Sequence, residues 1–194
     1  MTQDTRAGLQ ILSFPSAAEF EAWLAAQPRD HAGIWLKLSK KGSSTQSLAK
    51  HEAIDAALCH GWIDGQLAKC DEASWLIRFT PRRARSKWSD VNRSRALQLM
   101  DQGRMAPGGI AEVERAKSDG RWDAAYAPQS RAEVPSDLQT ALDQSPAAAQ
   151  FFATLTGTNR YAILYRIADA KRPDTRARRI QQYVELLERG RTLH

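Results

Sequence analysis

Cysteine is scarce in this chain of 194 residues, which contains only Cys59 and Cys70. A disulfide framework is therefore excluded, and the composition favours a reducing compartment. No run of about 18 apolar residues occurs, so the sequence predicts no transmembrane helix. The segment from Met1 to Arg6 is polar and lacks the apolar core of a secretory signal. We therefore expect a cytoplasmic protein.

The sequence also lacks the short motifs of several enzyme classes. It has no Gly-x-Ser-x-Gly nucleophile elbow, no Gly-x-Gly-x-x-Gly turn and no Walker A loop. The cysteines and two nearby histidines, His51 and His60, fit no zinc pattern, because neither Cys-x-x-Cys nor His-x-x-x-His occurs. We therefore expect neither a metal nor a cofactor.

Basic charge is abundant, and it is concentrated in one segment. The chain carries a formal net charge of +6. Residues 78–95 contain seven basic side chains and a single acid, Asp90, so this segment alone accounts for the whole surplus. A local excess of charge favours a binding site over a broad nucleic-acid or membrane surface.

The hydrophobic patterns predict an α+β fold. We expect a small mixed or antiparallel sheet with flanking helices within residues 8–130, followed by a helical C-terminal extension over 131–192, the two together forming one compact unit. Residues 1–7 are expected to be a loose tail. The main predicted strands are 34–38, 62–68 and 75–80, and the predicted C-terminal helices are 136–143, 146–155, 159–170 and 174–189.

Two of the predicted strands show alternation that assigns side chains to faces. The apolar positions expected on the core face are Ile63, Leu67, Trp75, Ile77 and Phe79. The polar positions expected on the opposite face are Asp64, Gln66, Arg78 and Thr80. An antiparallel register would then place Asp64 across from Arg78 or Thr80.

These strands and the loop after them contain the densest group of candidate ligand-binding residues. Arginine guanidiniums can bind two oxygens of a carboxylate or phosphate at once, and a helix that begins near Ser89 adds free backbone N–H groups. We therefore predict a pocket for an anionic small molecule such as phosphate, sulfate or a carboxylate. Its candidate residues are Trp62, Asp64, Gln66, Arg78, Thr80, Arg82, Arg83, Ser86, Trp88 and Ser89.

Each candidate has an expected role. Arg78, Arg82 and Arg83 would bind the anion, while Asp64 and Gln66 would orient the arginines or bind a polar group of the ligand. Ser86 and Ser89 would offer hydroxyls and backbone N–H groups. Trp62 and Trp88 would supply flat apolar walls.

Three alternatives remain open. In the first, an Asp64–Arg78 ion pair merely satisfies a sheet face and the other arginines are solvated. In the second, the protein is an enzyme in which Asp64 is the base. In the third, which ranks lowest, the basic segments bind nucleic acid. The oligomeric state is not predicted.

Several motifs resemble those of a known bacterial family. These are Ala57-Leu58-Cys59-His60-Gly61-Trp62-Ile63-Asp64-Gly65-Gln66, Phe79-Thr80-Pro81-Arg82-Arg83, Ser86-Lys87-Trp88-Ser89-Asp90-Val91-Asn92, Gly120-Arg121-Trp122-Asp123-Ala124-Ala125-Tyr126, and Ala170-Lys171 with Thr175-Arg176-Ala177-Arg178-Arg179-Ile180. Together they resemble the YdeI/OmpD-associated, or bacteriocin-protection, family over about residues 9–190.

The resemblance implies a cytoplasmic protein of the stress-response or bacteriocin-protection type, with no established reaction. His60 departs from the family pattern, in which an aromatic residue such as Phe is typical, and it is expected only at the pocket edge. Arg121, Trp122 and Tyr126 are expected to close the site.

Overall fold

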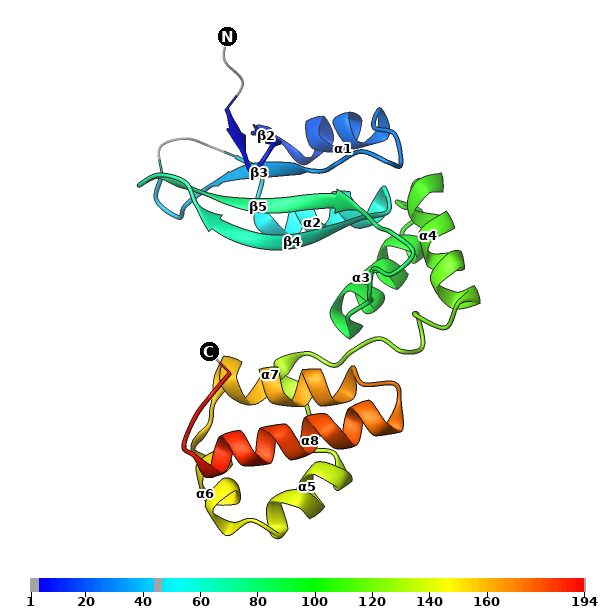
Figure 1. Ribbon diagram of the computed structural model, residues 1–194. Coiled ribbons are helices and arrows are strands. Elements are labelled where there is room, and N and C mark those ends of the chain that lie inside the picture. The colour runs from blue at the N-terminus through cyan, green and yellow to red at the C-terminus, as the bar shows by residue number, and fades with distance from the viewer. Residues whose placement is uncertain (1–3, 44–46, 194) are drawn as a thin grey trace. The chain divides into compact units, whose positions relative to one another are not determined.

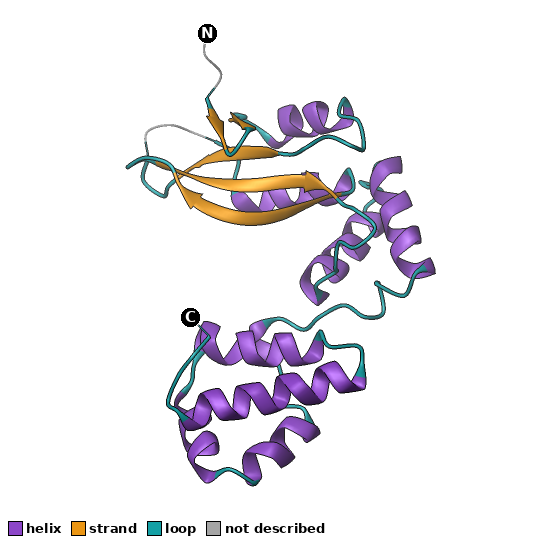
Figure 2. Cartoon of the chain, in the orientation of Figure 1, coloured by secondary structure: helices purple, strands orange, loops and turns teal. Residues whose placement is uncertain are grey.

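A computed structural model describes residues 4–43 and 47–193 (Figure 1). The chain divides into two compact units, Met1–Ala125 and Tyr126–His194. All strands of the described residues belong to the first unit, whereas the second is helical (Figure 2). The mixed sheet and C-terminal helices confirm the predicted α+β class.

The described residues form a five-stranded sheet in the order β1-β2-β3-β5-β4. The strands are β1 (Thr5–Arg6), β2 (Leu9–Leu12), β3 (Ile34–Ser39), β4 (Trp62–Lys69) and β5 (Ser74–Pro81). Only the β2–β3 pair is parallel, and the β1–β2, β3–β5 and β4–β5 pairs are antiparallel. The three predicted strands are therefore present, each extended by one or two residues.

The prediction of a loose N-terminal tail is wrong for Thr5 and Arg6. These residues pair with Gln10 and Leu9, and the Trp35 indole Nε1 donates a hydrogen bond of 3.1 Å to the Arg6 carbonyl. The contact between Trp35 and Arg6 joins residues far apart in the sequence, so local sequence patterns cannot predict it. Residues 1–3 of the predicted tail lie outside the described residues.

Helices α1 (Ala17–Ala25) and α2 (Lys50–Cys59) pack on one face of the sheet, and α2 lies behind β4 and β5 in Figure 1. Ser16 caps α1 because its hydroxyl accepts a hydrogen bond from Glu19 N. Apolar side chains from both helices and from three strands share one core with Phe20, Ile77 and Phe79 at its centre. The sheet is therefore buried on its helix-covered side.

Strand β4 contradicts the predicted face pattern. Asp64 is opposite Phe79, not Arg78 or Thr80, and the register shifts between Asp64 and Leu67. Trp62 therefore lies in the core, and Ile63, which we expected on the core face, is opposite Thr80. Leu67 is opposite Ile77 as expected but is 60% exposed on the edge strand. A β-bulge adds a residue to one strand and breaks the alternation that a period of two assumes.

Helices α3 (Asp90–Asp101) and α4 (Pro107–Ser118) pack against the end of α2 and share a core that includes Trp88 and Trp122. The start of α4 is held against the last turn of α2, where Ala106 N donates to the Cys59 carbonyl at 3.1 Å. A Cβ on Gly109 would lie 2.2 Å from that same carbonyl oxygen. Glycine is therefore required at position 109 for the two helices to approach this closely.

The second unit is a helical bundle around its own core, which includes Leu138, Ile163 and Leu187. It comprises a short 3-10 helix, Gln129–Arg131, and the helices α5 (Ser136–Asp143), α6 (Pro146–Thr154), α7 (Gly157–Ala168) and α8 (Pro173–Glu188). Each predicted C-terminal helix is observed within two residues of its expected bounds. Across both described ranges, 4–43 and 47–193, no helix has the length and hydropathy needed to cross a membrane.

Candidate functional site

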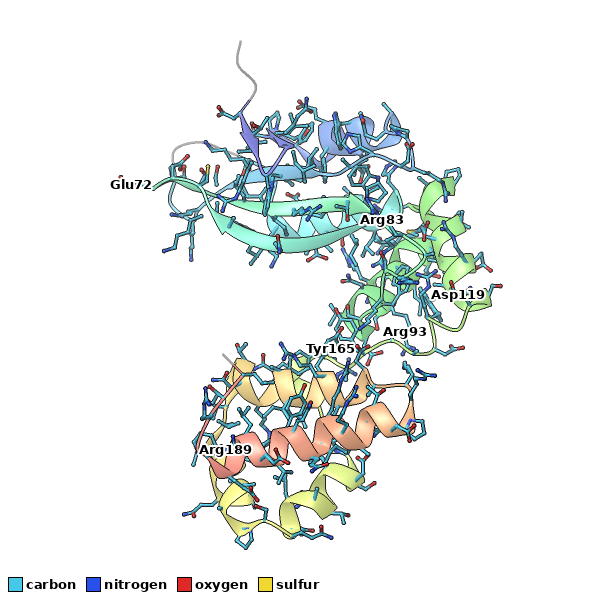
Figure 3. The ribbon with its side chains drawn as sticks, viewed as in Figure 1. Glu72, Arg83, Arg93, Asp119, Tyr165 and Arg189 are labelled. Carbon is cyan, nitrogen blue, oxygen red and sulfur yellow. The ribbon has the colours of Figure 1, made fainter. Side chains whose placement is uncertain are left out.

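Four of the predicted ligand-binding residues line one small cavity at the outward face of β4 and β5. This Arg78 cavity has a volume of about 310 Å3, and its lining residues are Gly65, Gln66, Arg78, Thr80 and Arg83. Arg78 and Thr80 project from the same face because they are two residues apart in β5. Arg83 follows the end of β5 (Figure 3).

The lining of the Arg78 cavity contains two guanidiniums and no carboxylate. The Nε atom of Arg78 is buried and has no hydrogen-bond acceptor. Within the described residues, Asp64 forms no ion pair with Arg78, so the predicted structural pairing of these two side chains is not formed. The cavity can therefore offer hydrogen-bond donors and positive charge to a small ligand.

A larger cavity of about 750 Å3, the Glu112 cavity, lies at the end of the sheet where α1, α2 and α4 meet. Trp62, Arg82 and Arg83 come from the predicted set. The other lining residues are Leu24, Ala25, Gln27, Pro28, Arg29, Asp30, His60, Gly61, Pro81, Ala106, Pro107, Gly108, Glu112 and Arg115. Arg83 thus lines both cavities.

Glu112 is the most unusual group in this larger cavity, because its side chain is only 4% exposed. Its Oε1 atom accepts a hydrogen bond from Arg115 Nη2 and lies 3.6 Å from Arg29 Nη1. Its Oε2 atom is buried without a hydrogen-bond partner. Buried carboxylates normally have all their lone pairs satisfied, so a hydrogen-bond donor at this oxygen would be favourable.

We did not predict Glu112, Arg29 and Arg115 from the sequence. An acid at position 112 within a predicted helix is usually solvated, and Arg29 follows a proline in an apparent turn. One available signal was the i, i+3 spacing of Glu112 and Arg115, which favours a pair on one helix face. A second was the Gly108-Gly109 pair at the helix start, which indicates close packing of that turn.

Arg82 is buried, and its contacts hold the loop after β5 in place. Its guanidinium carbon lies 3.6 Å from the centroid of the Trp88 ring, and Nη1 donates to the Lys87 carbonyl at 3.2 Å. Its backbone N–H donates to the Gly61 carbonyl at 2.9 Å. These contacts fix the loop after β5 against the end of α2.

The remaining predicted residues line neither cavity. Trp88 is 1% exposed within the core, Ser86 Oγ accepts a hydrogen bond from Arg83 N, and Ser89 Oγ accepts one from Asn92 N as the N-cap of α3. The Asp64 side chain has no hydrogen bond or ion pair with any residue that the structure describes, although its backbone belongs to the β4–β5 pair. Trp88, Ser86 and Ser89 therefore have structural contacts of their own in the loop and helix start.

The positive charge of residues 78–95 does not converge on one point. Arg95 forms a bidentate pair with Asp55, a buried carboxylate on α2. Arg93 pairs with Asp90 and also donates to the Trp122 carbonyl at 3.2 Å. Asp55, from outside residues 78–95, neutralises Arg95, and Asp90, the single acid within them, pairs with Arg93. The positive charge available to a ligand is therefore smaller than the net charge of this segment.

The three residues expected to close the site, Arg121, Trp122 and Tyr126, each have different neighbours. Arg121 Nη1 donates to the Ser86 carbonyl at 2.8 Å, which braces the loop after β5. The Trp122 ring packs at 4.9 Å, edge to face, on Trp88. Tyr126 belongs to the second unit, where its ring packs on Tyr165.

Burial changes the acid–base behaviour of two groups at the end of α2. It lowers the pKa of His60, which lines the Glu112 cavity, and the carboxylate of Glu21 opposes this effect only partly. Burial also raises the pKa of the Cys59 thiol, so this cysteine favours its neutral form. In both described ranges, no group of three or more His, Cys, Asp or Glu side chains is placed to hold a metal ion.

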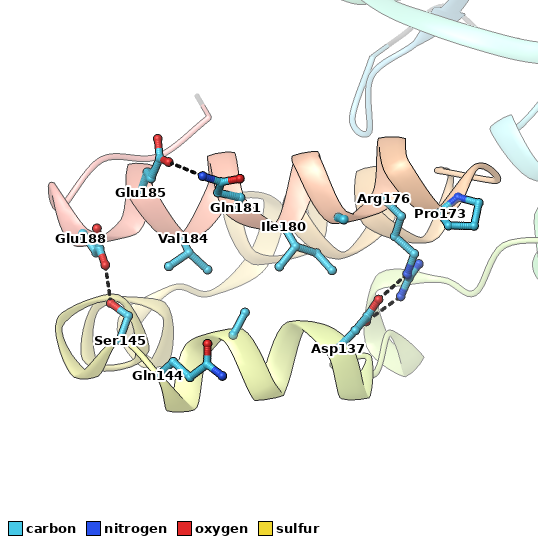
Figure 4. A pocket seen from close by; sticks show the side chains of 12 residues that line it. Asp137, Gln144, Ser145, Pro173, Arg176, Ile180, Gln181, Val184, Glu185 and Glu188 are labelled. Carbon is cyan, nitrogen blue, oxygen red and sulfur yellow. Dashed lines mark hydrogen bonds and ion pairs between the residues drawn. The ribbon is translucent and has the colours of Figure 1, made fainter.

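The helical unit has a groove of about 640 Å3 between α5 and α8 (Figure 4). Ion-paired and hydrogen-bonded residues lie at its ends, with Arg176 bound to Asp137 and Ser145 donating to Glu188. Ile180 and Val184 lie between them (Figure 4). Its polar side chains are thus largely paired with one another.

The architecture defines an α+β protein with a cavity-bearing first unit and a helical second unit. Residues 12–112 match a family described as a domain of unknown function (DUF8412), and the chain belongs to this family. Residues 131–190 match the family described as bacteriocin-protection, YdeI or OmpD-associated, which confirms the predicted family for this part of the chain. No curated protein and no solved structure matches the chain.

The second match covers the helical unit, whereas the motifs around Trp62 and Arg82 lie in the part that matches the domain of unknown function. The family match suggests a bacteriocin-protection type of function.

Proposed function

We propose that the first unit binds a small anion, such as phosphate, sulfate or a carboxylate group, in the Arg78 cavity. The observation that carries this proposal is the buried Arg78 Nε, which has no acceptor and belongs to a guanidinium beside Arg83 in a lining without carboxylates. A bound oxyanion would supply the missing acceptor and would be held by charge-assisted hydrogen bonds.

The other lining groups suit the same ligand. The Thr80 hydroxyl and the Gln66 amide can each donate a hydrogen bond to an oxygen, and neither adds negative charge. A volume of about 310 Å3 is enough for an inorganic oxyanion or for the anionic end of a small metabolite.

We propose further that this binding serves a cytoplasmic protein of the bacteriocin-protection or stress-response type. The family match of the helical unit supports the protective role, and the near absence of cysteine supports the location. Asp64 lines neither cavity, so the proposal includes no catalytic base.

Calorimetric titration with phosphate, sulfate and acetate tests the anion site. We expect saturable binding of at least one of these anions to the wild type and a loss of about tenfold or more in affinity for Arg78→Gln, because one charged donor pair is removed. Arg85→Gln is the matched control, since Arg85 is an exposed arginine of the same loop that lines neither cavity. Equal affinities of the wild type and Arg78→Gln, or no saturable binding, would contradict the proposal.

A further inference from the structure

The Glu112 cavity is a second site, separate in its chemistry from the Arg78 cavity. We propose that it binds a small zwitterion, that is, a molecule with an N–H-bearing cationic nitrogen at one end and a phosphate or carboxylate at the other. This inference shares only Arg83 with the Arg78 cavity and does not depend on anion binding at Arg78.

The cationic end is assigned to the unpartnered oxygen of Glu112. Arg115 and Arg29 both approach Oε1, and no hydrogen-bond donor of the described residues reaches Oε2. An unsatisfied oxygen on a carboxylate this deeply buried is costly, and a donor N–H from a ligand would remove that cost. A positively charged nitrogen would also be attracted by the carboxylate.

The protein holds Glu112 in this position through the packing of α4. The Glu112 Cγ lies so close to Gly61 that a Cβ there would be 2.9 Å away, and Gly61 has a φ of 75° that favours glycine. The neighbouring Gly108 and Gly109 let the first turn of α4 contact the last carbonyls of α2. Glu112 is therefore fixed by backbone contacts and cannot easily turn away to solvent.

The anionic end is assigned to the arginines around the mouth of the cavity. Arg29 is 61% exposed and Arg115 is 40% exposed, and Arg83 is exposed as well. Their guanidiniums have several N–H groups each, so an interaction with Glu112 leaves donors for a ligand. Asp30 is the only other carboxylate of the lining, so cationic groups outnumber anionic ones.

The Glu112 cavity contains a buried carboxylate and several arginines, so it favours a ligand that carries both a positive and a negative charge. A simple anion would meet the buried Glu112 carboxylate, and a simple cation would meet the arginines, so each would suffer repulsion at one end. A zwitterion is complementary at both ends. The volume of about 750 Å3 and the apolar contribution of Leu24, Pro28 and Trp62 suit a small organic molecule.

The test uses phosphoethanolamine as the probe and measures its affinity for the full chain by calorimetry. Phosphate and ethanolamine are the one-ended controls, and phosphocholine is the matched control because its nitrogen is cationic but has no N–H. We expect phosphoethanolamine to bind about tenfold more tightly than any of the three, because only it can both pair with the arginines and donate to Oε2.

Two variants locate the site. Glu112→Gln should reduce the affinity for phosphoethanolamine by about tenfold, since the charge is lost but the shape is kept. Arg115→Gln provides a second test at a partly exposed position should Glu112→Gln fail to fold, and it too should weaken binding. The four molecules are compared in the Arg78→Gln variant, in which anion binding in the Arg78 cavity is weakened, so that the measured affinities report the Glu112 cavity.

The proposal is overturned if, in the Arg78→Gln variant, phosphate or phosphocholine binds as tightly as phosphoethanolamine, or if phosphoethanolamine does not bind that variant saturably. It is also overturned if a folded Glu112→Gln, or Arg115→Gln where the former does not fold, keeps the wild-type affinity.

Discussion

Gly109 lies against Cys59 so closely that a Cβ at position 109 would approach the Cys59 carbonyl oxygen to 2.2 Å and the Leu58 carbonyl oxygen to 2.7 Å. This contact joins the start of α4 to the end of α2. The same junction positions Glu112, on the second turn of α4, beside Gly61 and His60 in the larger cavity. The geometry of that cavity therefore depends on a glycine that does not itself line it.

Gly109→Ala should lower the free energy of unfolding by about 1–3 kcal/mol, because the added methyl overpacks the junction by more than the better helix propensity of alanine can offset. Urea denaturation measures this change. Gly108→Ala is the control within the same helix, since its Cβ would be 3.1 Å from the nearest atom, the His60 carbonyl oxygen. A Gly109→Ala variant as stable as Gly108→Ala would show that the helices can separate at no cost.

The Asp55–Arg95 pair should contribute to the stability of the first unit. Arg95→Met should lower the free energy of unfolding by about 2 kcal/mol, because it leaves the buried Asp55 carboxylate without its bidentate partner. The double variant Asp55→Asn with Arg95→Met should lose about 1 kcal/mol less than the sum of the single variants. Strict additivity in this cycle would mean that the two side chains do not interact in solution.

His60 should make the stability dependent on pH. Its pKa in the folded state lies below the unfolded value of about 6.5, so between these two values the unfolded chain binds more protons. The free energy of unfolding should therefore fall as the pH is lowered from about 7 through that window. His60→Gln should remove this part of the dependence.

Denaturant titrations at several pH values between about 5 and 7.5 measure the effect. His51→Gln is the control, because His51 is an exposed histidine near the start of the same helix. Identical pH profiles for the wild type and His60→Gln would show that His60 keeps its ordinary pKa.

Local pattern was sufficient for the secondary structure and for part of the site. The helix start at Ser89 follows from its N-cap chemistry, and Ile77 and Phe79 are buried as the alternation in β5 predicts. The convergence of Gln66 with Arg78 on one cavity also agrees with the expectation that both lie on the polar face. These features depend on neighbours in sequence or on one strand pair.

The rest depends on contacts between distant segments. Because of the bulge after Asp64, Trp62 lies on the core face of the sheet and not on the polar face. The simple alternation of apolar and polar residues cannot predict where a bulge occurs. Trp88 was expected as a pocket wall, but the loop after β5 turns inward and buries it under Arg82. Asp55 binds Arg95 from another helix, so the sum of charges along one segment could not show which arginines remain available.

We propose that Arg78 and Arg83 hold an oxyanion, and an anomalous difference map from crystals of the protein soaked in selenate, an analogue of sulfate, locates that anion. We expect a selenium peak within hydrogen-bonding reach of the Arg78 guanidinium in the cavity lined by Gln66 and Thr80, and loss of that peak in Arg78→Gln. A map with no peak in this cavity, or with an unchanged peak in Arg78→Gln, would contradict anion binding by Arg78.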